Sequence, residues 1–168
     1  MNKKIIYCVI ILFAILLQLS FLPLIIGASA LGDAVLMLVL ALAVIDGFTL
    51  SLSWAIVAGI LYDFATYTTL GEHVIIFLLV AYVVSFFSRR LSVEVKGTGL
   101  LLLLLFIAVT TIISNWLLAI FLILGDKSIR FHMQAFGNFR LIVFQVCCNA
   151  IIFFLWYNLI GRIKKNIL

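Results

Sequence analysis

Long apolar segments separated by short polar interruptions dominate this sequence of 168 residues. A bilayer core about 30 Å thick needs about 20 consecutive apolar residues in a helix. Six segments approach this length, and almost the whole chain lies within them. Their approximate bounds are 4–26, 30–46, 50–68, 73–91, 97–124 and 137–161. The pattern predicts an all-α membrane protein, with six transmembrane helices in one compact bundle and a single domain over residues 1–168.

The composition agrees with this class of protein. The sequence is 67% hydrophobic and 10% charged, whereas a soluble domain is about half apolar and about a quarter charged. A net charge of +5 could suggest nucleic acid as a partner, but the basic residues fall at segment ends and form no patch. We therefore expect the lipid bilayer, and no nucleic acid, as the surroundings of this chain.

The basic residues also predict an orientation. With the N-terminus in the cytoplasm, eight Lys and Arg residues fall inside and three fall outside, and positive charge favours cytoplasmic loops. The inner group is Lys3, Lys4, Arg89, Arg90, Lys96, Arg162, Lys164 and Lys165, and the outer group is Lys127, Arg130 and Arg140. Both termini are therefore predicted to be cytoplasmic.

The N-terminal segment has a second interpretation. "MNKK", an apolar run and then the "ASA" of residues 28–30 resemble a secretory signal with its cleavage site. The apolar run continues to about Ile26, which is longer than the core of such a signal and favours a retained span. Cys8, Cys147 and Cys148 all lie within apolar runs, and we expect them to be small buried residues outside any disulfide or metal site.

One carboxylate stands well inside a predicted span. Asp63 lies about 20 Å from the start of the third segment, where it should face protein or water and not lipid. Ser51, Ala55, Gly59, Asp63 and Tyr67 recur every fourth residue and so share one helical face. Small residues on a face allow another helix to come close. The sequence leaves open whether this face only packs or also carries function.

Polar residues on later segments are candidate partners for Asp63. The fifth segment groups Thr110, Thr111, Ser114 and Asn115 on one face, and the sixth groups Asn138, Gln145 and Asn149 on one side. Our hypothesis is a hydrogen bond to Asp63 from Asn115, Arg140 or Tyr67. Gly71 is expected to close the third segment in the left-handed conformation that satisfies the last helical carbonyls. The short second segment and the "DGFT" turn predict a tight hairpin with the third segment.

Motifs for catalysis and for ligand binding are absent from the sequence. His73 and His132 fall near the predicted outer interface without metal-ligand company, and we expect solvated or capping roles for them. We find no nucleophile elbow and no Gly-rich phosphate loop. A single intramembrane acid also argues against an ion carrier. We expect no enzyme, no cofactor and no metal. The outer segment "GDKSIRFHMQAFG" could lie on the membrane surface or contact a partner.

The stretch from Gly59 to Arg90 resembles the rod shape-determining protein MreD family. In that family a small-residue helix ends in a pattern like G-[AL]-[IL]-x-D-[LF], followed by a short polar run and L-G. Here residues 59–64 are "GILYDF" and residues 70–71 are "LG". The next helix, through "FLLVAYVVSFFSRRL", is similar as well. The second span departs from the family, because it opens with "LGD" at residues 31–33 and lacks the proline that is often found there.

This resemblance implies a non-enzymatic, multi-pass component of the cell-elongation machinery in the bacterial inner (cytoplasmic) membrane. Such proteins associate with the bitopic protein MreC. With it they link MreB filaments to the glycosyltransferase and transpeptidase that synthesise peptidoglycan. Ala55, Gly59 and Asp63 would form a close-packed face for a partner or for packing, and Gly71 would shape the outer turn.

A transporter subunit is the alternative function. Substrate-binding subunits of energy-coupling-factor vitamin transporters are also small six-helix membrane proteins. They often carry an Ala-x-x-x-Ala pattern in the first helix, where this chain has Ala14 alone. That difference favours the cell-shape function.

Overall fold

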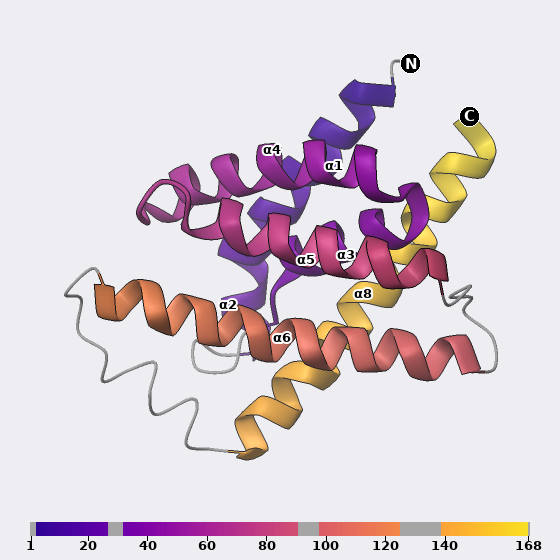
Figure 1. Ribbon diagram of the computed structural model, residues 1–168. Helices are drawn as coiled ribbons and strands as arrows, with labels where there is room; N and C mark the ends of the chain where they lie inside the picture. The colour runs from indigo at the N-terminus through magenta and orange to yellow at the C-terminus, as the bar shows by residue number, and fades with distance from the viewer. Residues whose placement is uncertain (1–2, 27–31, 91–97, 125–138, 168) are drawn as a thin grey trace.

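The structure, a computed structural model, describes residues 3–26, 32–90, 98–124 and 139–167, and all of the elements within them are helical (Figure 1). The helices are α1 (Lys3–Leu16), the π-helical turn η1 (Leu17–Phe21), α2 (Leu22–Ile26), α3 (Ala34–Asp46), α4 (Phe48–Thr66), α5 (Glu72–Arg90), α6 (Thr98–Leu124) and α8 (Phe139–Ile167). The α1, η1 and α2 elements follow one another without a break and together fill the first predicted segment.

In the described part of the chain, four helices are long and apolar enough to cross a membrane. They are Lys4–Leu24, Phe48–Thr66, Gly99–Phe121 and Phe139–Lys165, and two shorter apolar helices are Ala34–Asp46 and Glu72–Ser88. At 1.5 Å per residue the 13 residues of α3 extend only about 20 Å. The fold is therefore that of an all-α protein with four candidate spans. The count of six spans and the cytoplasmic side of the termini stay predictions.

The short helix α3 forms the centre of the bundle. Every residue from Ala34 to Ala43 is buried, as in a helix that other helices surround on all sides. The neighbouring helices α1, α4, α5 and α8 all pack against it. Gly47, at φ 76°, then connects α3 directly to α4. The tight hairpin predicted from the sequence is therefore present.

The remaining helices lie around this centre. In Figure 1, α4 and α5 run side by side as an antiparallel hairpin, α6 lies along α5, and α8 crosses behind α6. The start of α1 and the end of α8 lie toward the same end of the bundle (Figure 1). Asp46 connects them, because its carboxylate accepts hydrogen bonds from the Tyr7 hydroxyl at 2.7 Å and from Lys164 Nζ at 2.9 Å.

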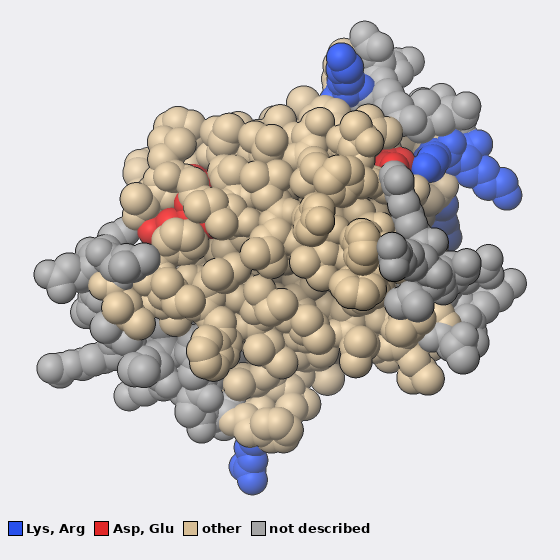
Figure 2. All heavy atoms as spheres, viewed as in Figure 1, with Lys and Arg blue, Asp and Glu red and all other residues tan. Residues whose placement is uncertain are grey.

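The face of the bundle in Figure 2 carries few charged side chains, and many large apolar side chains of the described residues are exposed, as on a surface that faces lipid. Leu101 and Ile151, for example, are 68% and 63% exposed. The same surface corrects one prediction. Cys8 and Cys147 are exposed, and Cys148 is half-buried. Their apolar neighbours suggested burial, but in a membrane protein an apolar neighbourhood suits lipid as well as protein.

Candidate functional site

The carboxylate of Asp63 ties the end of α4 to the start of α5. It is almost fully buried. Its Oδ2 accepts the Gly71 N–H at 2.7 Å. Its Oδ1 accepts the His73 N–H at 3.1 Å and the Thr68 hydroxyl at 3.2 Å, and lies 2.7 Å from His73 Nδ1. We call Asp63, Thr68, Gly71 and His73 the Asp63 cluster.

The backbone of the turn brings these groups together. Helix α4 ends at Thr66, and Tyr67 adopts the left-handed conformation with φ 54° and ψ 32°. The N–H groups of Tyr67 and Thr68 both donate to the carbonyl oxygen of Asp63. Gly71, at φ 105°, opens α5, where its carbonyl oxygen accepts the Ile75 N–H at 3.0 Å. The main chain and the side chain of Asp63 therefore both hold the same turn.

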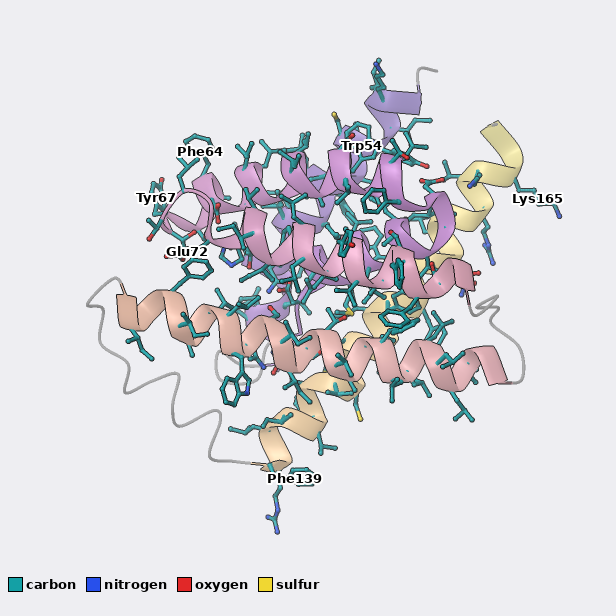
Figure 3. All side chains as sticks on the ribbon, viewed as in Figure 1. Trp54, Phe64, Tyr67, Glu72, Phe139 and Lys165 are labelled. Carbon is teal, nitrogen blue, oxygen red and sulfur yellow. The ribbon has the colours of Figure 1, made fainter. Side chains whose placement is uncertain are left out.

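The predictions for two residues of this turn, Tyr67 and Gly71, were wrong. Tyr67 does not continue the buried face of α4, because it is 94% exposed beyond the helix end and points away from the bundle (Figure 3). Tyr67 and not Gly71 takes the left-handed position after α4. Gly71 instead shapes the entrance to α5. The expected glycine cap was wrong because the polar run is long enough to end one helix and start the next separately.

The hypothesised donors to Asp63 were also wrong. Tyr67 is exposed, and Asn115 Nδ2 donates to Gln145 Oε1 at 2.8 Å. Arg140 is exposed near the start of α8. The donors that the structure gives to the Asp63 carboxylate all lie within ten residues of it. These donors depend on the turn after Thr66, which brings the start of α5 back to the last turn of α4.

His73 and Thr68 are residues of the site that the sequence did not predict. The sequence suggests a solvated or capping role for His73, yet only 7% of it is exposed. An ionised carboxylate only accepts hydrogen bonds, so a bond from the imidazole to an ionised Asp63 needs a proton on His73 Nδ1. The imidazole packs edge-on against the Tyr62 ring, with 4.6 Å between centroids, and lies 5.9 Å from the Phe77 ring. The ring is therefore held in one orientation.

The hydrogen bonds of the Asp63 cluster link the end of α4 to the start of α5. Among the described residues, no group of three His, Cys, Asp or Glu side chains could hold a metal ion. Glu72 lies beside the Asp63 cluster in the first turn of α5 (Figure 3), where the helix dipole favours a carboxylate.

The small-residue face of α4 packs inside the chain. A Cβ atom on Gly59 would lie 2.6 Å from the Val74 Cα, so the backbones of α4 and α5 touch at this point. Ala55 is fully buried, and the hydroxyl groups of Ser51 and Ser85 are 3.2 Å apart. Ala55, Gly59 and Asp63 thus share a close-packed seam, and the element against that seam is α5.

A second polar group lies at the start of α3. Gln18 Oε1 accepts the Ala34 N–H at 2.6 Å, and Asn149 Oδ1 accepts the Asp33 N–H at 2.7 Å. Trp156 Nε1 donates to the Ala34 carbonyl oxygen at 3.0 Å. Gln18 lies in the π-helical turn η1, and such turns redirect side chains within a helix. The first backbone groups of α3 are therefore satisfied by side chains from α8 and η1.

The polar faces predicted for the fifth and sixth segments bond to each other. Asn149 Nδ2 donates to Thr111 Oγ1 at 2.8 Å, and Asn115 Nδ2 donates to Gln145 Oε1 at 2.8 Å. The sequence grouped these residues correctly by face but did not pair the faces. Asn138, His132 and the expected outer contact segment at 125–138 lie outside the described residues.

No family model matches the sequence, and comparisons with curated proteins and with solved structures found no match. The described residues define a class: an all-helical protein with four helices able to cross a membrane and with internal polar clusters.

Proposed function

We propose that this chain is a non-enzymatic membrane scaffold of the bacterial cell-elongation machinery, similar to MreD. In this function it binds an MreC-like bitopic partner and supports peptidoglycan synthesis by the glycosyltransferase and transpeptidase of that machinery. Its place is the bacterial inner membrane. The apolar surface and the four helices long enough to span a bilayer support a membrane location.

The observation that carries the proposal is the structural use of the residues that resemble the MreD pattern. Gly59 lets α4 and α5 touch, the Asp63 carboxylate bonds the turn, and Gly71 supplies both a positive φ and an N–H donor. A spaced Gly, Asp and Gly are therefore what a hairpin of this geometry requires. The pattern thus describes a closely packed hairpin, which suits a scaffold.

The seam does not itself offer a docking face, because α5 covers it within the chain. An MreC-like transmembrane helix would then contact an outer face of the bundle, and Asp63 would act on binding only by fixing the hairpin. This role predicts that changing Asp63 weakens assembly through the shape of the hairpin and not through a lost contact with the partner.

The test is co-purification of the full chain with an MreC-like protein from the same membrane. We expect the native chain and Ser53→Ala to retain the partner, because Ser53 is exposed and its hydroxyl donates only to the Thr49 carbonyl oxygen at 3.3 Å. Asp63→Ala should retain less. A chain that binds no MreC-like protein but carries a small molecule, or copurifies with transporter ATPases, would overturn the proposal in favour of a vitamin-transport subunit.

A further inference from the structure

An apolar groove separates α1 from α8 on the outer surface of the bundle. Both helices pack against α3. The groove has a volume of about 280 Å³. The residues that line it are Phe13, Leu17, Ile152, Leu155, Trp156 and Leu159. The one polar side-chain atom among them is the indole nitrogen of Trp156. Phe13 and Leu155 are more than half exposed, so the groove opens toward lipid.

The base of this groove is held in place. Trp156 is buried, and its Nε1 donates to the Ala34 carbonyl oxygen at 3.0 Å. Its ring meets Phe13 edge-on, with 6.3 Å between centroids. The one polar atom of the indole is therefore already bonded, and the groove presents hydrocarbon along its length. An open apolar groove of this kind suits a hydrocarbon chain.

One end of the groove is positively charged. Arg162 lies one helical turn beyond Leu159 and two turns beyond Leu155, on the side of α8 that lines the groove. Arg162 and Lys165 are both exposed. Figure 2 shows basic side chains at the end of the bundle where α8 ends, and Figure 3 shows Lys165 extending from that end of α8. Asp46, the acidic residue among the described ones there, is buried and already paired with Lys164.

We propose that the groove binds an anionic phospholipid, with an acyl chain along Phe13, Leu155 and Leu159 and the phosphate at Arg162. Guanidinium groups bind phosphate in a forked geometry, and basic pockets between membrane helices select anionic headgroups. A zwitterionic lipid could fill the groove but would gain less from Arg162. A partner helix would fill it without any need for the cation. The charge at the end of the groove therefore favours the anionic lipid.

The test uses the full chain, purified alone, with phosphatidylglycerol and phosphatidylcholine offered together in nanodiscs. Native mass spectrometry then gives the ratio of the two lipids that stay bound. The native chain should prefer phosphatidylglycerol. Arg162→Gln should lower the preference about fivefold, and adding Lys165→Gln should lower it further. No partner protein is present, so this result is independent of the proposed scaffold function.

Lys4→Gln is the matched control. Lys4 is an exposed cation near the start of α1, but it is nine residues from Phe13 and hence on the opposite side of the helix from the groove. This variant should keep the native preference. Leu155→Trp, which fills the groove while keeping the charges, should release both lipids. Equal retention of the two lipids by the native chain, or equal losses in Arg162→Gln and Lys4→Gln, would overturn the proposal. So would a photocrosslinker at Leu155 that captures protein and no lipid in native membranes.

Discussion

His73 Nδ1 lies 2.7 Å from Asp63 Oδ1, across the turn that joins α4 to α5. Both residues are buried, and the same carboxylate also accepts the backbone N–H of His73. A carboxylate inside a membrane protein usually marks a functional path or a polar partner. Here the partners come from its own hairpin. The acid therefore fixes the geometry of α4 and α5 relative to each other.

Removing the charge from Asp63 should loosen this hairpin. In Asp63→Asn the amide nitrogen replaces an acceptor and faces N–H groups of Gly71 or His73, which are donors themselves. Leaving buried donors without an acceptor costs about 1–3 kcal/mol in the free energy of unfolding. The measurement is unfolding in detergent followed by circular dichroism. Ser53→Ala is the control, and equal stability of the two variants would show that the Asp63 cluster contributes little to the free energy of unfolding.

The imidazole of His73 can be tested separately. In His73→Asn the side-chain amide offers an N–H close to the position of Nδ1, so much of the bond to Asp63 should survive. His73→Phe keeps an aromatic ring against Tyr62 but removes the donor. We expect the phenylalanine variant to be less stable than the asparagine variant by about 1 kcal/mol. The reverse order would mean that ring packing, and not the hydrogen bond, holds His73 in place.

Gly59 should tolerate no side chain. A Cβ atom there would lie 2.6 Å from the Val74 Cα and 2.8 Å from the Val74 nitrogen, and backbone atoms cannot move aside as a flexible side chain can. Gly59→Ala should force α4 and α5 apart and cost about 1–3 kcal/mol. Gly161→Ala is the matched control, because a Cβ atom on Gly161 would meet nothing within 4 Å. Thermal unfolding that lowers both midpoints equally would contradict the close contact.

Much of the fold follows from the hydrophobic pattern because the bilayer imposes it. Helix α4 begins and ends within two residues of the predicted 50–68 segment, and α6 matches 97–124 within one residue. Burial is harder to predict. Cys147 is exposed and Ala43 is fully buried, although both lie in apolar runs. Lipid and protein are both apolar, so hydrophobicity does not say which of them a side chain contacts.

The sequence predicts part of the site, but it does not predict the hydrogen-bond partners of Asp63. The four-residue spacing placed Ala55, Gly59 and Asp63 on one face correctly, since helical geometry alone decides this. The donors to Asp63 depend on how the chain turns after Thr66, and the left-handed Tyr67 that begins this turn is a residue type that rarely adopts φ near 54°. Because this turn could not be predicted from the sequence, the contact between His73 and Asp63 could not be predicted either.

The two unusual backbone positions of this turn should respond in opposite ways. Gly71 has φ 105°, which L-residues rarely adopt, although a Cβ atom there would meet nothing within 4 Å. Gly71→Ala should therefore cost about 1–2 kcal/mol through backbone strain alone. Tyr67 is 94% exposed in a left-handed conformation, so Tyr67→Gly should relieve strain and be neutral or stabilising. Equal destabilisation by the two variants in the same unfolding assay would contradict the backbone assignment.

The contact between Asp46 and Lys164 should link the two ends of the chain. The Asp46 side chain is 2% exposed and the Lys164 side chain is 42% exposed, and Lys164 also donates to the Ile45 carbonyl oxygen. Lys164→Met leaves a buried carboxylate with the Tyr7 hydroxyl as its remaining side-chain donor. Because Lys164 is partly exposed, we expect a loss of about 1–2 kcal/mol.

The double variant decides whether that loss comes from the charge. Asp46→Asn combined with Lys164→Met has neither ion, so no buried charge is left without a counter-ion. The double variant should be more stable than the sum of the single changes predicts, by about 0.5–2 kcal/mol in a double-mutant cycle. Because Asp46 contacts both α1 and α8, the single change Lys164→Met should also raise hydrogen exchange near Tyr7. Additive losses in stability, with no rise in hydrogen exchange near Tyr7, would mean that the ion pair of Asp46 and Lys164 does not hold α1 and α8 together.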